Sequence, residues 1–246
     1  MEDYAFLNKK SESDTIFVPI GSIEVHSNLP FGTDAFISRA CADLMAQKTG
    51  AAVFPTIYTG VCPGTGVFSE TIGIDPTAFI AYLEKLTLAL LETFPKVIYI
   101  NIHNGNDASL RAAVEQIYLN HKKTVLYVNV YKCLKEKDPF LGRDNNLKEA
   151  SLLYASLDTL GVDPTPYMVD KDAVPEKDKD IAALKEYGYF GYSYLSEGQH
   201  ISPVAGVSLK EGIDYLNMVA ESAADIIKCF DNVLTLQNEK RRRNHE

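Results

Sequence analysis

Four residues of the kinds that bind metal ions stand at the ends of two short apolar segments. Glu24 and His26 follow the first segment two residues apart, so an extended backbone directs both side chains to one side. Asp34 comes after a short turn containing proline and glycine, and His103 ends a later apolar segment. Because ligands bind where the carboxyl ends of parallel strands meet, we expect all four side chains at one rim of a sheet.

These four side chains suit a hydrolytic metal centre. Imidazole and carboxylate ligands together favour Zn, Mn, Fe or Ni, and a carboxylate such as Asp34 can bridge two ions. Two ions about 3.5–4 Å apart activate a water molecule and polarise a carbonyl group. Such a centre hydrolyses its substrate without a nucleophilic side chain.

Each residue also has a structural interpretation. Asp34 alone is better explained as the N-cap of the next helix, and His103 alone as a buried histidine beside an Asn-Gly turn. Glu24 and His26, which share one extended step after a strand, are harder to explain in this way. The joint placement of all four residues favours the metal site.

Strand-like and helix-like segments alternate through the first two-thirds of the chain. Short apolar runs predict buried strands at Thr15–Ile20, Ala52–Tyr58, Val97–Ile102 and Thr124–Val130. Helical segments lie between them, at Ala35–Lys48, Thr77–Thr93 and Ala108–His121. This alternation predicts an α/β fold, a Rossmann-like three-layer αβα sandwich with a mostly parallel central sheet.

The last third of the chain has a less regular pattern. We expect helices at Glu149–Leu157, near Glu176–Tyr187 and from Leu209 to Leu234, with a covering loop at Gly188–Ser208. Residues 1–236 then form a single α/β domain, and residues 237–246 form a disordered basic tail.

The composition excludes several functional classes. The 246 residues carry a net charge of −9, which argues against a nucleic-acid partner despite the basic cluster Arg241–Arg243. No apolar run approaches the ~20 residues of a membrane span, and no signal-peptide pattern follows Met1. Four scattered cysteines are typical of a reducing compartment. We expect a cytoplasmic protein that acts on a small molecule, with no membrane partner.

Several segments, in order along the chain, resemble the motifs of the creatininase family. The stretch VPIGSIEVHSNLPFGTD is similar to the signature G-S-x-E-Q-H-G-P-H-L-P-x-x-x-D, and YINIHNGND to the element N-G-H-G-G-N. Tyr58–Gly66, followed by SETIGI, resembles the family's Y-G…P-G-T-I-S element. Glu149 begins a stretch similar to the E-T-S helix, and residues 203–212 loosely resemble the late Gly-rich segment.

The resemblance implies two divalent metal ions (Zn, Mn or Fe) in a hydrolase of the amidohydrolase type. Its implied ligands are Glu24, His26, Asp34 and His103, with Glu149 as a fifth and Asp34 bridging. Without the resemblance, Glu149 would be interpreted as a solvated helix residue. Members of the family are commonly homo-oligomers, often hexamers, so the resemblance also implies self-association.

The chain departs from the family pattern at several positions. One residue and a histidine are missing around Ser27 and Asn28, and Gly105 stands where creatininases carry a glutamate ligand. Asp144 replaces a histidine that handles protons, and the chain has no tryptophan to enclose creatinine. Asp144 and His200 are the remaining candidates for proton transfer, although His200 alone is better explained as an exposed loop residue.

Three functional hypotheses follow from these observations. The first is hydrolysis of a non-peptide C–N bond, in a cyclic amide or formamide, by a metal-bound hydroxide at a dinuclear site. The second is a degenerate, non-catalytic relative that binds a small ligand or serves as a scaffold. A nucleotide-binding Rossmann enzyme is the third, but no G-x-G-x-x-G follows the first strand.

Overall fold

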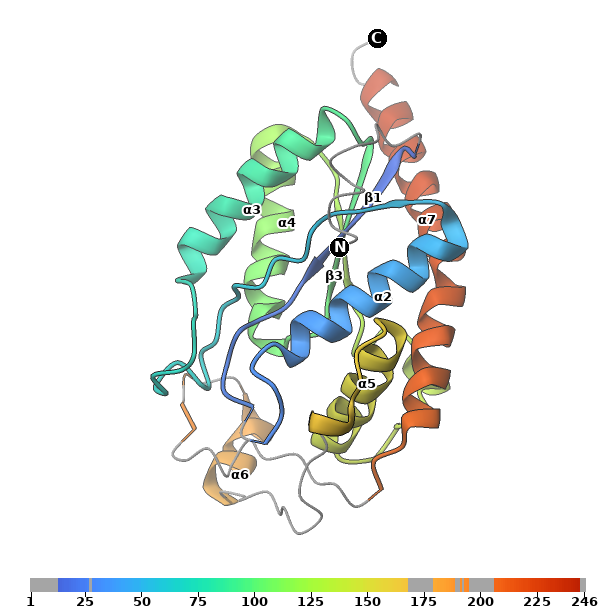
Figure 1. Ribbon diagram of the computed structural model, residues 1–246. Helices are drawn as coiled ribbons and strands as arrows, with labels where there is room; N and C mark the ends of the chain where they lie inside the picture. Colours follow the sequence, from blue (N-terminus) through green and yellow to red (C-terminus); the bar gives the residue numbers. More distant parts are fainter. Residues whose placement is uncertain are drawn as a thin grey trace.

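A parallel sheet organises the chain (Figure 1). The computed structural model describes residues 13–26, 28–167, 179–188, 191, 193–194 and 206–243. In this part of the chain, four parallel strands are arranged in the order β2-β1-β3-β4. Their bounds are β1 Thr15–Ile20, β2 Ala52–Val53, β3 Lys96–Asn101 and β4 Leu126–Asn129. The predicted α/β fold is confirmed.

Helices cover both faces of the sheet. One layer contains α2 (Thr33–Thr49), α5 (Asn145–Thr159) and α7 (Leu209–Arg243), which pack against one another. The other contains α3 (Pro76–Leu91) and α4 (Asp107–His121). Each layer has its own buried apolar cluster. A further short helix, α6, spans Lys179–Tyr187.

The two central strands are buried along their whole length, as their continuous apolar runs predict. The chain leaves β1 toward β2 on one side and reaches β3 on the other. The gap between the carboxyl ends of β1 and β3 is therefore a switch point, where open α/β sheets bind ligands.

Several predicted boundaries are wrong; α5, for example, begins at Asn145 and not at Glu149. The strand predicted at Ala52–Tyr58 shortens to Ala52–Val53, because the pairing with β1 slips by one residue: the N–H of Phe54 donates to Phe17, and the next N–H to reach β1, that of Ile57, donates to Pro19. Pairing resumes at a single bridge between Ile57 and Ile20. The tail predicted to be disordered from residue 237 instead continues α7 to Arg243, since its Gln, Glu, Lys and Arg residues favour helix.

Among the described residues, no helix is both long enough and apolar enough to cross a membrane. The longest, α7, instead packs one face against α2 and α5.

Helices α5 and α7 approach so closely that only glycine fits at one point. A Cβ atom at Gly212 of α7 would lie 2.3 Å from the carbonyl oxygen of Ser151 and 2.9 Å from the Cβ of Ala155. The close approach fixes the position of α5, the helix that carries Glu149.

We expect Gly212→Ala to lower the free energy of unfolding by about 1–3 kcal/mol, the usual cost of overpacking. The sign of this change in stability separates two effects, because helix propensity alone would make the alanine variant more stable by ~1 kcal/mol. Urea denaturation measures the change. Gly188→Ala is the matched control, since nothing lies within 4 Å of its added Cβ. Equal or higher stability of Gly212→Ala would contradict the packing argument.

Candidate metal centre

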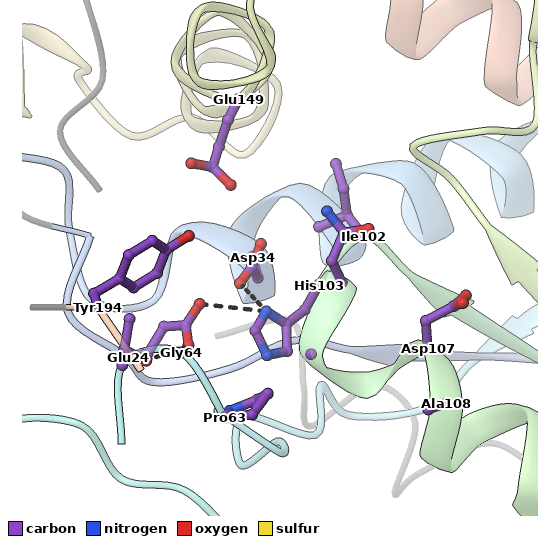
Figure 2. Close-up of a pocket in the computed structure, with 13 residues that line it drawn as sticks. Glu24, Asp34, Pro63, Gly64, Ile102, His103, Asp107, Ala108, Glu149 and Tyr194 are labelled. Carbon is purple, nitrogen blue, oxygen red and sulfur yellow. Dashed lines mark hydrogen bonds and ion pairs between the residues drawn. The ribbon is translucent and has the colours of Figure 1, made fainter. Parts of the chain in front are cut away.

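The predicted site residues converge at the switch point of the sheet. Glu24 and His26 lie in the segment after β1, Asp34 lies in the first turn of α2, and His103 directly follows β3. All four side chains are buried. Figure 2 shows Glu149 of α5 facing this group across a cavity of about 400 Å³.

Glu24, Asp34 and His103 form the tightest part of the site. The Nδ1 atom of His103 lies 2.9 Å from Oδ2 of Asp34 and 3.3 Å from Oε1 of Glu24. Asp34 is not the N-cap of α2, since Gly32 occupies that position. Its carboxylate points into the site, so the N-cap interpretation of Asp34 is wrong.

His26 and Glu149 form the second part. The Nε2 atom of His26 lies 3.5 Å from Oδ2 of Asp34, 3.7 Å from Oε1 of Glu24 and 3.9 Å from Oε1 of Glu149. The same Asp34 oxygen therefore faces both imidazoles, which is the position that a bridging ligand needs.

Backbone carbonyl groups orient both imidazole rings. Nδ1 of His26 lies 3.0 Å from the carbonyl oxygen of Glu24, and Nε2 of His103 lies 2.9 Å from that of Val61. Each of these nitrogens is then an N–H donor, and the opposite nitrogen of each ring faces the carboxylates. Metal-binding histidines are held in the same way.

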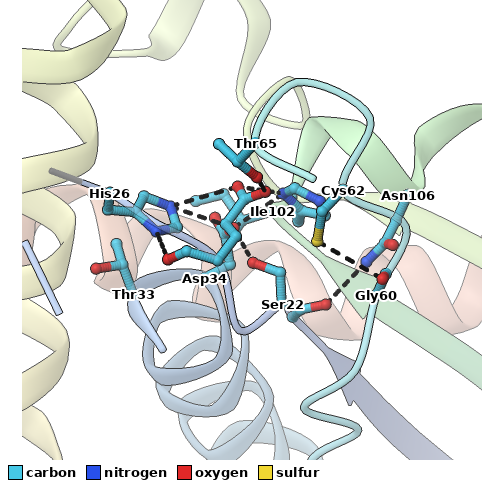
Figure 3. A network of polar contacts seen from close by, with 12 residues as sticks. Ser22, His26, Thr33, Asp34, Gly60, Cys62, Thr65, Ile102 and Asn106 are labelled. Atoms are coloured by element: carbon cyan, nitrogen blue, oxygen red, sulfur yellow. Dashed lines mark hydrogen bonds and ion pairs between the residues drawn. The ribbon is translucent and has the colours of Figure 1, made fainter. Parts of the chain in front are cut away.

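Hydroxyl groups hold the two innermost carboxylates (Figure 3). Ser22 donates to Oδ2 of Asp34 at 2.7 Å, and Thr65 donates to Oε2 of Glu24 at 2.6 Å. Each carboxylate is thus fixed by a neutral donor, which leaves its negative charge available to a cation.

A buried asparagine ties together the three loops that build the site. The Asn106 amide donates to the carbonyl oxygen of Gly21 and to the side chain of Asn101, both at 3.0 Å. It also accepts the backbone N–H of Val61 at 2.8 Å. Asn106 therefore links the ends of β1 and β3 to the loop after β2.

The electrostatics of the cluster show excess negative charge. Burial opposes a charged imidazole, yet Asp34, Glu149 and Glu24 together raise the pKa of His26 to about 10. Burial raises the pKa of Glu149 to about 7; His26 opposes this shift, and Asp34 and Glu24 add to it. The carboxylates thus attract positive charge, whether protons or a metal ion.

The structure brings all five predicted ligands together, while their binding of metal stays a prediction. Asp144 caps α5 by accepting the N–H of Asn146, is exposed, and is not among the residues that line the cavity. Its role in proton transfer also stays a prediction, and His200 lies outside the described residues.

Other site residues escaped the sequence analysis. Ser22, Thr65 and Asn106 stand inside the motifs quoted above, but their residue types alone suggest turns rather than ligand support. Tyr194, which stands in the segment Gly188–Ser208 expected to be a covering loop, lines the cavity. Its backbone N–H donates to Gly64 at 2.8 Å, and Figure 2 shows its hydroxyl pointing into the space between Glu149 and Asp34.

Comparison with known proteins agrees with this geometry. The family model Creatininase, described as creatinine amidohydrolase, matches residues 2–161. The 3-dehydro-scyllo-inosose hydrolase of Thermotoga maritima is 29% identical over 131 residues, or 51% of this chain and 42% of that protein. The mycofactocin precursor peptide peptidase of Mycolicibacterium smegmatis is 29% identical over 106 residues, or 40% and 43%. The chain thus covers less than half the length of these relatives.

The fold is also that of solved creatininases. A structure described as "Creatininase Mn" superposes with a TM-score of 0.67 at 16% identity and covers 93% of this chain and 95% of that one. At this identity the likeness shows the fold alone.

We expect the metal-free protein to lose stability as the pH rises from 7 to 10. The pKa of His26 is about 10 in the folded state against 6.5 ordinarily, so its contribution is complete below about pH 6.5 and is lost through pH 10. Glu149 acts in the same direction but at lower pH, since its pKa rises from 4.5 to about 7 and its contribution is lost between those two values.

Melting temperatures of metal-free protein across this range measure the effect. The fall should be at least about 2–4 °C, the change that 1 kcal/mol produces at this size. His26→Gln should lessen the fall without abolishing it, because, against the opposing effect of burial, Glu24 and Asp34 also raise the pKa of His103. His121→Gln should leave the fall unchanged, because His121 pairs with Glu84 outside the centre. A melting temperature that rises with pH would contradict the assignment.

Proposed function

The chain belongs to the creatininase family, and we propose that it is a metal-dependent hydrolase of a non-peptide C–N bond in a cyclic amide or formamide. The observation that carries the proposal is the convergence of two oriented imidazoles and three carboxylates beside one cavity. Of the two relatives named above, one is a hydrolase by name and the other a peptidase, and both names support hydrolysis as the reaction class.

The residues present fit two divalent ions. Glu24, Asp34 and His103 would hold one ion, and His26, Asp34 and Glu149 the other, with Asp34 shared. The fit rests on the donor set, because each imidazole already gives its N–H to a carbonyl and turns its other nitrogen to the carboxylates. Mixed nitrogen and carboxylate ligands suit Zn, Mn or Fe.

Bound ions would supply Lewis-acid chemistry, by making water more acidic and polarising the substrate carbonyl. The chain supplies the rest. The cavity beside the ligands has the volume of a small-molecule site, and Tyr194 covers one side of it. Because the chain has no tryptophan, we propose a substrate other than creatinine.

Proton delivery to the leaving nitrogen has two candidates. Asp144 stands where the family has a histidine that handles protons, whereas Tyr194 is the residue whose hydroxyl faces the cavity. A group must come within about 2.6–3.2 Å of the atom it protonates, so the geometry favours Tyr194.

Removing the shared carboxylate tests the metal centre. We expect Asp34→Asn to bind fewer than two metal ions and to lose activity roughly a thousandfold. The reason is that the ions would lower the activation free energy by several kcal/mol. Metal analysis after gel filtration measures the first effect, and turnover of a panel of amides, formamides and lactones measures the second.

Asp43→Asn is the matched control, because Asp43 lies on the same helix and pairs with Arg39, with both side chains 20% exposed. It should keep both ions and full activity. Two ions retained by Asp34→Asn would contradict the bridging role. Two ions in the native protein with no turnover of any compound would favour the non-catalytic binder.

Proton delivery has its own test. We expect Tyr194→Phe to lower turnover by about 10²–10⁴-fold with unchanged metal content, which is the range for a general acid. Asp144→Asn is the comparison, because asparagine caps helices as well as aspartate. A loss of turnover in Asp144→Asn, with Tyr194→Phe unaffected, would assign the proton to Asp144.

A further inference from the structure

We infer that Cys62 is a thiolate ligand of the ion held by Glu24 and His103. The inference rests on the proposed metal centre and goes beyond it, since it adds a sulfur to an otherwise nitrogen and oxygen set. It also bears on which metal the centre selects.

The geometry places Cys62 among ligand groups. Glu24, Cys62 and His103 each offer one ligand atom, and these atoms all lie within 4.8 Å of one another. All three residues are buried, with Cys62 only 6% exposed. The Sγ atom lies 3.6 Å from the carbonyl oxygen of Gly60, a weak contact that metal binding can replace (Figure 3).

The loop that carries Cys62 is fixed against His103. The carbonyl of Val61, the preceding residue, accepts the Nε2–H of His103, and the N–H of Val61 donates to Asn106. The ring and the thiol are therefore positioned by the same two backbone groups, so the approach of Cys62 to His103 is built into the loop.

The Nε2 side of His103 is closed by backbone, so only Nδ1, the nitrogen that faces Glu24, is open to an ion. A Cβ atom at Gly105 would lie 2.4 Å from Nε2 of His103 and 2.2 Å from the carbonyl oxygen of Val61. The loop of residues 58–66 fills that space, and Cys62 is the residue of this loop that offers a soft ligand atom.

A role as the attacking nucleophile does not fit. Glu24 and His103 line the cavity, whereas Cys62 is not among its lining residues. The thiol therefore faces the ligand cluster and not the substrate. As a ligand it gives its proton to solvent, and a thiolate favours Zn, Fe or Co over Mn or Mg.

Cobalt substitution tests the inference in the whole 246-residue chain. We expect Co²⁺ added to metal-free protein to produce an intense near-ultraviolet sulfur-to-cobalt charge-transfer band together with visible d–d bands. Cys62→Ser should lose the charge-transfer band, keep the d–d bands and bind Co²⁺ about 10–100-fold more weakly. Cys229→Ser is the control, since Cys229 is exposed on α7, and should keep both.

X-ray absorption of the zinc-loaded native protein gives a second measurement that needs no variant. A sulfur shell at about 2.3 Å would support the inference if Cys62→Ser does not fold. Bound Co²⁺ or Zn²⁺ with no sulfur signal would overturn the role of Cys62 and leave the proposed centre standing. A charge-transfer band lost in Cys229→Ser but kept in Cys62→Ser would also overturn it. Failure to bind either ion would overturn the metal centre itself.

Discussion

Buried carboxylates without enough positive charge are the constraint on which the site depends. Glu24 and Asp34 are 5% and 2% exposed, and Glu149 faces them from α5. Removing carboxylates from water is costly unless a cation compensates. Two imidazoles supply that charge only when protonated, and the raised pKa of His26 shows how strongly the cluster attracts it. A divalent ion would meet the same need with more charge, so the proposed metal would compete with protons for one place.

Several elements of the fold together hold the carboxylates close to one another. The carboxyl ends of β1 and β3 lie side by side because six residue pairs bind them in register. Asn106 then joins both ends to the loop after β2. The apolar clusters on the two faces of the sheet hold this frame, so ligand positions do not depend on the ligands themselves. Preformed geometry of this kind keeps like charges close without metal.

Sequence reasoning succeeds where local pattern and tertiary environment agree. The central strands were predicted to within one residue, because a strand buried on both faces must be apolar throughout. Glu24, His26 and His103 were predicted together because strand ends meet at one edge. Glu149 was not predictable from its sequence neighbours, because two adjacent charged residues usually indicate an exposed helix face. Here Lys148 is only 3% exposed, and the two side chains point into different parts of the interior. Cys62 and Thr65 were not predicted as site residues, because their loop has no hydrophobic periodicity. The loop is positioned by Asn106, which lies about forty residues later in the sequence.

Glu149 shows how the centre differs on its two sides. Its side chain is 15% exposed, against 1–7% for the other four, and its oxygen lies farthest from His26. Lys148 anchors this part of α5 by donating to Asp138 and to the carbonyl of Tyr131. The helix is thus fixed while the Glu149 side chain keeps some freedom. Because side chains adjust at far lower cost than packed helices, the Glu149 side of the proposed centre would adapt to a bound substrate, and the Glu24–His103 side would stay rigid.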